Sequence, residues 1–209
     1  MKVLNLYAGI GGNRKKWTNC EVTAVEIDPK IAAVYAEQHP QDNLIIGDAH
    51  QYLLDHSSEY DFIWSSPPCQ SHTRMIKSGK NRRPRYAVMD LYQQVIFLNN
   101  FYDGKWVVEN VVPYYEPLIP PYKKVGRHLF WSNFRFEATD VPQPKGFIMQ
   151  TTVAGNKGLM DWLGIHYSGT LYYEGNHDAG QVLRNCVHPD VGLQIFEEVK
   201  NQPVQGSLW

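Results

Sequence analysis

The sequence predicts an α/β protein of one main domain, in which a mostly parallel sheet carries helices on both faces. Between residues 2 and 109, short apolar runs alternate with amphipathic or polar stretches, as consecutive βαβ units do. Four of these runs end in glycine or polar residues, and open parallel sheets bind their ligands at such strand ends. The length of 209 residues allows a full hydrophobic core, and the composition is that of a folded protein.

The predicted strands are the short apolar runs of this first half. They cover residues 3–7, 22–26, 44–46, 61–64 and 106–109. A helix is predicted to begin at Asp28 and Pro29, because Asp is a favourable N-cap and Pro suits the first helical position. Apolar residues at positions 88, 91, 95 and 98 recur at helical spacing and predict a further helix.

The second half of the chain has a different pattern. Residues 129–136 alternate well enough to predict a strand, and residues 189–200 predict a helix with one apolar face. Residues 137–180 are rich in Gly, Pro, Asn and aromatic residues and show weak periodicity. We therefore expect a main domain of residues 1–136 and 181–209, with residues 137–180 as a small loop-rich appendage.

Composition excludes several classes of protein. The three cysteines form no CxxC pair and the eight histidines show no HExxH spacing, so neither a disulfide framework nor a metal site is predicted. No apolar run reaches transmembrane length, and the chain opens on strand-like residues rather than on a signal peptide. We therefore expect a cytoplasmic protein.

The net charge of −1 does not by itself indicate a nucleic-acid-binding protein, but the charge distribution does. Between residues 71 and 86 there is no acidic residue, and the segment contains Arg74, Lys77, Lys80, Arg82, Arg83 and Arg85. A solvated loop is one interpretation of this segment. Because it follows Cys69 and Gln70 directly, an anionic partner near that cysteine is the other.

Glycine or acidic residues follow each of the first three predicted strands. The first strand leads into Tyr7-Ala8-Gly9-Ile10-Gly11-Gly12, a turn that lets the backbone approach a ligand and is expected to open a helix. Glu26 ends the second strand, where a carboxylate can accept hydrogen bonds from ribose hydroxyls. Asp48 follows the third strand and either contacts a ligand or caps a helix. Together these signals predict a cofactor that carries a nucleoside and need not carry phosphates.

Two further strand ends carry reactive side chains. Cys69 follows Pro67 and Pro68, which stiffen the backbone and prevent it from continuing a sheet ladder. Read alone, Cys69 is a buried structural thiol or a presented nucleophile. Glu109 ends an apolar strand, so its desolvated carboxyl should have a raised pKa and could share a proton at neutral pH.

These residues together resemble the DNA (cytosine-5)-methyltransferase family. The resemblance rests on segments that occur in the family's order: 6–12, 25–28 and 47–49 for the cofactor, 67–70 (Pro-Pro-Cys-Gln) for the nucleophile and 109–111 (Glu-Asn-Val) for the acid. Residues 184–189 resemble the closing motif, with Arg184 in place of glycine. Where the family shows an Arg-x-Arg pair, this chain keeps only Arg127. The short region before the last motif is typical of compact phage- or prophage-type members.

The resemblance implies a Rossmann-like S-adenosylmethionine-dependent methyltransferase fold and methyl transfer to carbon-5 of a flipped cytosine in double-stranded DNA. It implies catalytic roles for Cys69, Glu109 and Arg127, the last holding the base carbonyl and helping to keep Cys69 ionised. The implied cofactor-binding residues are Tyr7, Ala8, Gly9, Gly11, Gly12, Glu26, Ile27, Asp48, Ala49, Pro67, Asn185 and Val187. The implied nucleic-acid-binding residues are Gln70, Ser71, Arg74, Lys77, Lys80, Arg82, Arg83 and Arg85. Residues 137–180 become the target-recognition region of a monomer that works in the bacterial nucleoid or a phage-infected cell.

Two alternatives stay open at the level of sequence. An RNA cytosine methyltransferase, acting for example on tRNA, needs the same residues, because a flipped cytosine presents the same ring in either polymer. A non-catalytic DNA-binding protein on a decayed methyltransferase fold is the other, although Cys69 and Glu109 are both retained.

Overall fold

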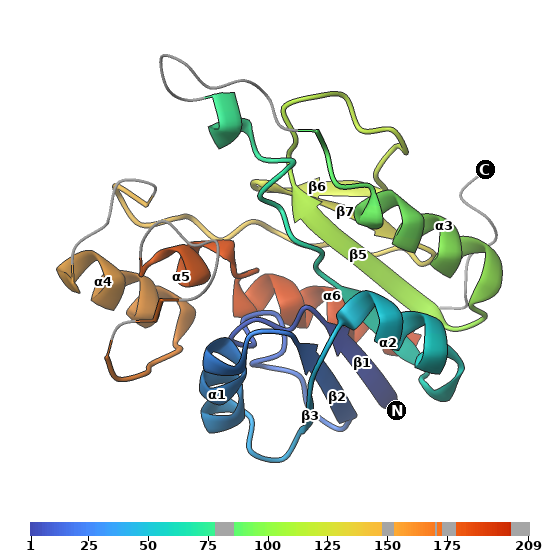
Figure 1. Cartoon of the computed structure of the whole chain (residues 1–209), viewed down its shortest axis with the longest axis horizontal. Coiled ribbons are helices and arrows are strands. Elements are labelled where there is room, and N and C mark those ends of the chain that lie inside the picture. Colours follow the sequence, from blue (N-terminus) through green and yellow to red (C-terminus); the bar gives the residue numbers. More distant parts are fainter. Residues whose placement is uncertain (78–85, 148–152, 170, 173–178, 202–209) are drawn as a thin grey trace.

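The computed structural model describes residues 1–77, 86–147, 153–169, 171–172 and 179–201 (Figure 1). Its strands are β1 (Lys2–Leu6), β2 (Glu21–Glu26), β3 (Asn43–Ile46), β4 (Phe62–Ser65), β5 (Lys105–Val111), β6 (Lys123–Val125) and β7 (His128–Ser132). Its helices are α1 (Pro29–Gln38), α2 (Ala49–His56), η1 (Ser57–Glu59), η2 (Arg74–Lys77), α3 (Asp90–Phe101), α4 (Val153–Leu163), α5 (Gln181–Asn185) and α6 (Pro189–Asn201).

The seven strands form one mixed sheet in the order β3-β2-β1-β4-β5-β7-β6. The pairs among β1 to β5 are parallel, whereas β7 is antiparallel to both β5 and β6. Leu6 pairs with Val25 and Ser65, and Ser65 pairs with Val108. The residues that follow these four, namely Tyr7, Glu26, Ser66 and Glu109, therefore lie on one line across the sheet. Ligands of open parallel sheets bind outside this edge.

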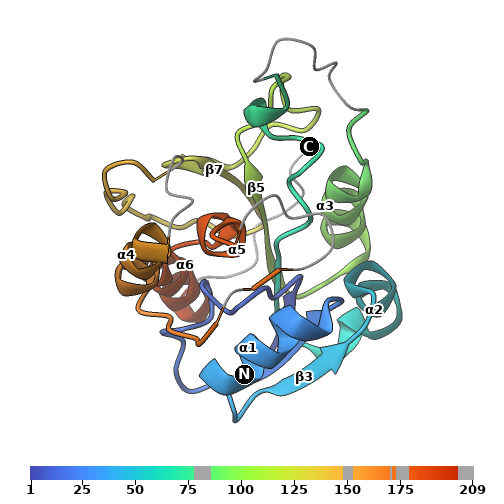
Figure 2. The ribbon, with the colours of Figure 1, turned by 60° about the vertical axis from the view of Figure 1, so that its left-hand side comes forward.

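Helices cover both faces of the sheet, as predicted (Figures 1 and 2). Alternate residues of a strand point to opposite faces, so each strand contributes to two cores. On one face, Val3, Phe62 and Val107 pack with apolar residues of α6. On the other face, Leu4 and Ile63 pack with apolar residues of α2 and α3. The sheet is thus a central layer between two helical layers.

The helix expected directly after the glycine turn does not form. Between β1 and β2 the chain makes successive turns, which side-chain contacts hold in place. Arg14 forms a two-pronged ion pair with Asp42, and Tyr35 on α1 donates a third hydrogen bond to the same carboxylate. Asn13 bonds to Asn5 on β1. Side-chain contacts, and not a helix, therefore hold this loop in place at the sheet edge.

Two other sequence predictions need correction in detail. The strand predicted over residues 129–136 ends at Ser132, because the Ser132 hydroxyl bonds to both backbone groups of Phe134 and turns the chain. The predicted helix that includes Val88 begins only at Asp90, and the Val88 N–H donates instead to the Ser71 hydroxyl at 3.0 Å.

Residues 137–180, expected to form a loop-rich appendage, contain a helix, α4, that their weak periodicity did not indicate. α4 packs with α5, and Leu159 and Leu163 share a buried cluster with Ile31 and Val34 of α1. In the described ranges, no helix is long and apolar enough to cross a membrane. The same ranges contain no group of three or more side chains that could hold a metal ion.

Candidate active site

A pocket of about 540 Å³ opens at the carboxyl edge of the parallel strands. Its walls come from the loop after β1, the end of β2, the segment after β4, the end of β5 and the residues before α6. The predicted site residues that line it are Tyr7, Ala8, Gly9, Gly12, Glu26, Ile27, Pro67, Cys69, Gln70, Glu109, Asn185 and Val187. The fold therefore brings together motifs that are more than a hundred residues apart in sequence.

Glu26 forms the floor of one half of the pocket. Its two carboxyl oxygens accept hydrogen bonds from the backbone N–H groups of Gly9, at 2.9 Å, and Asp28, at 3.0 Å. Burial raises the pKa of Glu26, and these backbone hydrogen bonds oppose the rise. Each oxygen keeps a second lone pair for a ligand. The carboxylate is thus fixed in place as a hydrogen-bond acceptor.

Cys69 sits on a short segment that neighbouring elements hold rigidly. The Ser66 N–H donates to the Leu6 carbonyl of β1, and the Asn110 side chain of β5 donates to the Pro67 carbonyl at 2.9 Å. Beyond the cysteine, the N–H groups of His72 and Thr73 both donate to the Cys69 carbonyl. These contacts, together with the two prolines, present the thiol to the pocket in one orientation.

The thiol form of Cys69 is favoured in the protein alone. Burial raises its pKa to about 11, and the negative charge of Glu109 adds to that rise. The charge of Arg127 lowers the pKa but does not outweigh these effects. Arg127 thus acts on Cys69 in the expected direction, but burial and Glu109 outweigh it in the protein without a ligand. Thiolate formation requires a further change in charge around the sulfur.

Glu109 lies across the sheet edge from Ser66, on the strand beside the cysteine segment. Burial raises its pKa to about 7, while a hydrogen bond from Ser66 and the charge of Arg127 hold the rise back. The sequence-based expectation of a raised pKa is confirmed. At neutral pH this carboxyl exists as a mixture of acid and carboxylate, the state that suits a group which transfers protons.

The chain's C-terminal part closes the pocket. Asn185, Cys186 and Val187 connect α5 to α6 and line the pocket opposite the loop after β1. A Cβ atom at Gly12 would lie 2.7 Å from the Val187 carbonyl oxygen, which is closer than real Cβ atoms approach. Gly12 is therefore required for this contact.

Several predicted residues do not meet the pocket. Asp48 caps α2 by accepting from the N–H groups of His50 and Gln51, the structural alternative noted from the sequence, and neither Asp48 nor Ala49 lines the pocket. Gly11 faces His39, the C-cap of α1, instead. Arg127 lies behind the pocket, with its guanidinium 5.0 Å from the Phe147 ring centroid.

The nucleic-acid-binding prediction can be followed only at its start. Ser71 is buried, and Arg74 donates from Nε to the Pro113 carbonyl at 3.1 Å. Lys80, Arg82, Arg83, Arg85 and the side chain of Lys77 lie outside the described residues.

Residues that sequence reasoning gave no role also shape the site. Asn110 and Ser66 contact the Cys69 segment and Glu109, and both could have been suspected because they adjoin a motif residue. His72 is buried and its ring bonds to the Tyr115 hydroxyl. His128 lies with Nε2 3.6 Å from Glu109 Oε1, a proximity that only the pairing of β5 with β7 reveals.

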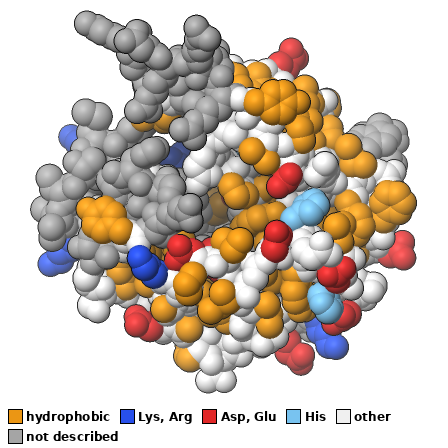
Figure 3. Space-filling view, viewed as in Figure 1, with side chains coloured by type: hydrophobic (Ala, Val, Ile, Leu, Met, Phe, Trp, Pro, Cys, Tyr) orange, Lys and Arg blue, Asp and Glu red, His pale blue; other side chains and the backbone are white. Residues whose placement is uncertain are grey.

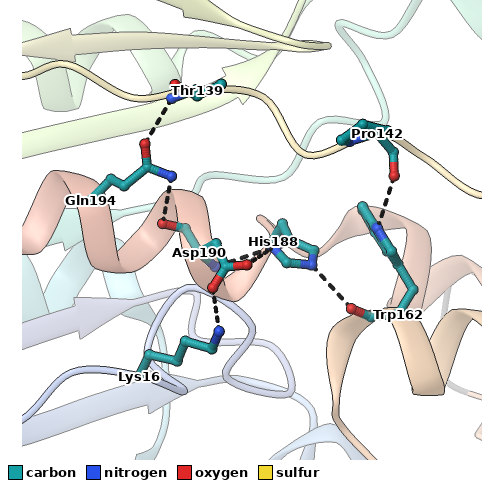
Figure 4. Close-up of polar contacts among 7 residues, drawn as sticks. All are labelled: Lys16, Thr139, Pro142, Trp162, His188, Asp190 and Gln194. Carbon is teal, nitrogen blue, oxygen red and sulfur yellow. Dashed lines mark hydrogen bonds and ion pairs between the residues drawn. The ribbon is translucent and has the colours of Figure 1, made fainter.

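A polar network joins the appendage to the closing segment of the pocket (Figure 4). His188 pairs through Nε2 with the Trp162 carbonyl at 3.0 Å and accepts at Nδ1 from the Asp190 N–H. Gln194 accepts from the Thr139 N–H, and Lys16 pairs with the Asp190 carboxylate. Because His188 follows Val187 directly, α4 is connected to the residues that line the pocket.

Comparisons with known proteins agree with this arrangement. The model of the C-5 cytosine-specific DNA methylase family matches residues 1–113. A tRNA (cytosine(38)-C(5))-methyltransferase from Spodoptera frugiperda is 34% identical over 91 residues, which are 40% of this chain and 27% of that protein. The chain thus spans about a quarter of the length of this curated relative.

Two solved structures are also similar. A DNMT2 variant from Spodoptera frugiperda has 30% sequence identity and a TM-score of 0.36, covering 53% of this chain and 35% of that one. The methyltransferase EhMeth from Entamoeba histolytica has 11% identity and a TM-score of 0.52, covering 95% and 97% of the two chains. The second likeness extends over the whole chain and concerns the fold.

The family model covers more than half of the sequence, including the glycine turn, Glu26, Cys69 and Glu109. The fold around these residues is the methyltransferase fold that EhMeth shares. This chain therefore belongs to the C-5 cytosine-specific DNA methylase family, and its cofactor is S-adenosylmethionine.

Proposed function

We propose that this protein transfers a methyl group from S-adenosylmethionine to carbon-5 of a flipped cytosine in DNA, through a covalent adduct on Cys69. The observation that carries the proposal is that Cys69 and Glu109 line the same pocket as Glu26 and the glycine turn. A nucleophile and a proton-sharing acid thus lie beside a nucleoside-binding edge. This arrangement matches methyl transfer to a ring carbon that needs activation.

The charge of the pocket suits S-adenosylmethionine. Its described lining includes the acids Glu26, Asp28 and Glu109 but no Lys or Arg, which fits a cofactor with a positive sulfonium and no phosphate. Figure 3 shows hydrophobic and acidic side chains over the middle of the displayed face, together with His and other polar groups, while Lys and Arg are seen mainly in its left part and at its lower right. Glu26 would accept from the ribose hydroxyls, and Ile27, 67% exposed, would cover the adenine. When bound, the cofactor supplies an electrophilic methyl group.

Cys69 activates the base. Carbon-5 of cytosine is a weak nucleophile, and attack of the Cys69 sulfur on carbon-6 converts the ring into an enamine whose carbon-5 can accept the methyl group. Loss of the carbon-5 proton to a base, with elimination of Cys69, then restores the aromatic ring and frees the enzyme. The stiff segment around Cys69 holds the sulfur ready for this attack.

Glu109 supplies the proton that the attack requires. As the sulfur adds to carbon-6, negative charge develops on ring nitrogen 3, and a protonated Glu109 neutralises it. While Glu109 is protonated and donates to nitrogen 3, it carries no negative charge and no longer raises the pKa of the Cys69 thiol. The same contact therefore also favours the thiolate form of Cys69.

DNA is the proposed polymer because the matching family is a DNA methylase family and a basic segment follows the nucleophile. The target base must leave the helical stack to reach the pocket, at a cost of about a few kcal/mol. We propose that the 71–86 segment contributes contacts to phosphates that offset this cost. Residues 137–180 are proposed to contact the neighbouring bases.

Trapping with DNA that contains 5-fluorocytosine tests this function directly. Fluorine at carbon-5 cannot leave as a proton does, so the wild-type protein should form a stable adduct that needs S-adenosylmethionine. Cys69→Ala should bind the DNA yet form no adduct and transfer no methyl group. Methyl transfer by Cys69→Ala would reject the nucleophile, and the absence of any wild-type adduct would favour a non-catalytic DNA-binding protein.

A second candidate substrate is tRNA, because the curated relative is named as a tRNA cytosine-38 methyltransferase. The catalytic residues would act on either polymer. Parallel incubations with labelled cofactor and either duplex DNA or unmodified tRNA separate the two. Incorporation into tRNA alone would replace DNA by tRNA in the proposal and leave the chemistry unchanged.

A further inference from the structure

His128 is a buried histidine beside the candidate acid that nothing so far assigns a role. It is 8% exposed, and its Nε2 atom has no hydrogen-bond partner among the described residues. Nε2 lies 3.6 Å from Oε1 of Glu109. A buried nitrogen left without a partner is costly, so such an atom in a native protein needs an explanation.

Strand pairing fixes the proximity of the two side chains. In the antiparallel ladder of β5 and β7, His128 pairs with Val111 and Glu109 pairs with Phe130. His128 and Glu109 are therefore diagonal neighbours on the same face of the sheet. Phe130 packs in the core on that face and contacts the His128 ring edge-on, at 6.4 Å between centroids. The imidazole thus has few places to point other than toward Glu109.

Burial, together with the charge of Arg127, keeps the His128 ring neutral. Burial lowers the pKa of His128 to about 3, and the adjacent Arg127 guanidinium contributes to this. The other titratable groups near Arg127 are Cys69, Glu109, Cys186 and Arg184. A neutral imidazole has one N–H, and the Nε2–H tautomer can donate to Glu109 Oε1 whether the carboxyl is ionised or protonated. At 3.6 Å the two atoms lie just beyond hydrogen-bond length, so this donation requires a small side-chain rotation.

We infer that His128 is a positioning residue for the reaction, and that its Nε2–H holds Oε1 of Glu109 so that the other oxygen carries the proton to nitrogen 3 of the base. This inference rests on the proposed function. If the carboxyl group rotated freely, its proton would point away from nitrogen 3 of the base part of the time. A misplacement of about 1 Å in such a group costs on the order of a hundredfold in rate.

Two substitutions separate this role from simple packing. His128→Phe keeps a planar ring in the core and removes the donor, whereas His128→Gln keeps an N–H at nearly the same reach. We expect His128→Phe to lower kcat by roughly ten- to a hundredfold with an unchanged KM for the cofactor. We expect His128→Gln to recover most of the rate.

The pKa of Glu109 itself gives a second readout that does not depend on turnover. Infrared or carbon-13 titration of the free protein, with Glu109→Gln to assign the signal, should show this pKa rising by roughly one unit in His128→Phe and not in His128→Gln, because the lost donor had stabilised the carboxylate. In a Glu109→Gln background, adding His128→Phe should change kcat little. An unchanged Glu109 titration, or equal rates in the Phe and Gln variants, would overturn the inference.

The two proposals fail in different ways. If the wild-type protein forms no 5-fluorocytosine adduct, the proposed function is rejected, and the titration still reports whether His128 and Glu109 interact. If the adduct forms and the titration is unaffected by His128→Phe, only the role of His128 is rejected.

Discussion

The pocket contains two strand-end carboxyls, Glu26 and Glu109, in opposite surroundings. Glu26 accepts hydrogen bonds from two backbone N–H groups. Burial raises the pKa of Glu26, and these fixed donors oppose the rise. Glu109 is surrounded by side chains, namely Ser66, Arg127 and His128, and its pKa rises to about 7. Both are acids at the ends of parallel strands, yet only one is held ready to change its protonation.

The difference teaches how one sheet edge serves two purposes. Backbone donors suit an acceptor whose charge must stay constant while it binds hydroxyl groups. Side-chain donors can move and can exchange protons, which suits an acid that gives and regains a proton in each cycle. The half of the pocket around Glu26, proposed for the cofactor, thus surrounds its acid with backbone donors. The half around Glu109, proposed for the target base, surrounds its acid with side-chain donors.

The largest effect that would test this contrast is expected for Glu109→Gln. The amide keeps the shape and a hydrogen bond but cannot give a proton, so kcat should fall by about 10²- to 10⁴-fold. The KM for S-adenosylmethionine should stay within about twofold of wild type, as measured by steady-state methyl transfer. A large loss of cofactor affinity would mean that Glu109 belongs to the cofactor half.

Stability against pH should show the same contrast without any substrate. The pKa of Glu109 is higher in the folded than in the unfolded protein, so its contribution is fully present below about pH 4.3 and is lost as the pH rises through about 7. The wild-type protein should therefore lose up to about 3 kcal/mol relative to Glu109→Gln over this range. Urea unfolding of both proteins at pH 5 and pH 8 measures the difference, and parallel changes in both would contradict it.

Asn110→Ala should disturb the nucleophile without touching either acid. The buried Asn110 amide holds the Pro67 carbonyl, and its loss leaves that carbonyl unpaired at a cost of about 1–3 kcal/mol. We expect roughly tenfold slower adduct formation with 5-fluorocytosine DNA. As a control of similar kind, Asn133→Ala removes amide hydrogen bonds to Trp106 and Gly104 far from Cys69, and it should affect stability but not the adduct rate of the folded protein.

Glu26→Gln is expected to give the smallest effect on catalysis. It should instead weaken the binding of the cofactor. The amide cannot accept from all the groups that the carboxylate serves, so the Kd for S-adenosylmethionine should rise by about tenfold. The kcat at saturating cofactor should change little. Calorimetry with the cofactor alone, followed by saturated turnover, checks both points; a fall in kcat as large as that of Glu109→Gln would remove the contrast between the two acids.

Much of the parallel sheet could be predicted because buried parallel strands appear as short apolar runs. The helix α4 could not, because Gly155 and Gly158 interrupt its apolar pattern and lower its helix propensity. Asp48 was ambiguous for a physical reason. A carboxylate after a strand accepts equally well from a ligand or from the first N–H groups of a helix, and here it does the latter.

The site residues that belong to a sequence motif could be predicted. The residues that reach the site only through strand pairing could not. Cys69 and Glu109 can be read from their own motifs. The place of His128 cannot, because it follows from the register of β7 on β5, and no local sequence pattern specifies which residue of one strand meets which residue of another.

The close approach of α6 to the loop after β1 has a consequence for the order in which the protein matures. A Cβ at Gly192 would lie 2.2 Å from the Asn13 carbonyl oxygen, and the Trp17 indole donates to the Gly192 carbonyl. The first and the last of the pocket's walls are thus synthesised almost the whole chain apart. A nascent chain that already includes Cys69 and Glu109 still lacks one side of its pocket until α6 leaves the ribosome. The pocket therefore becomes complete only after the chain has been synthesised through α6.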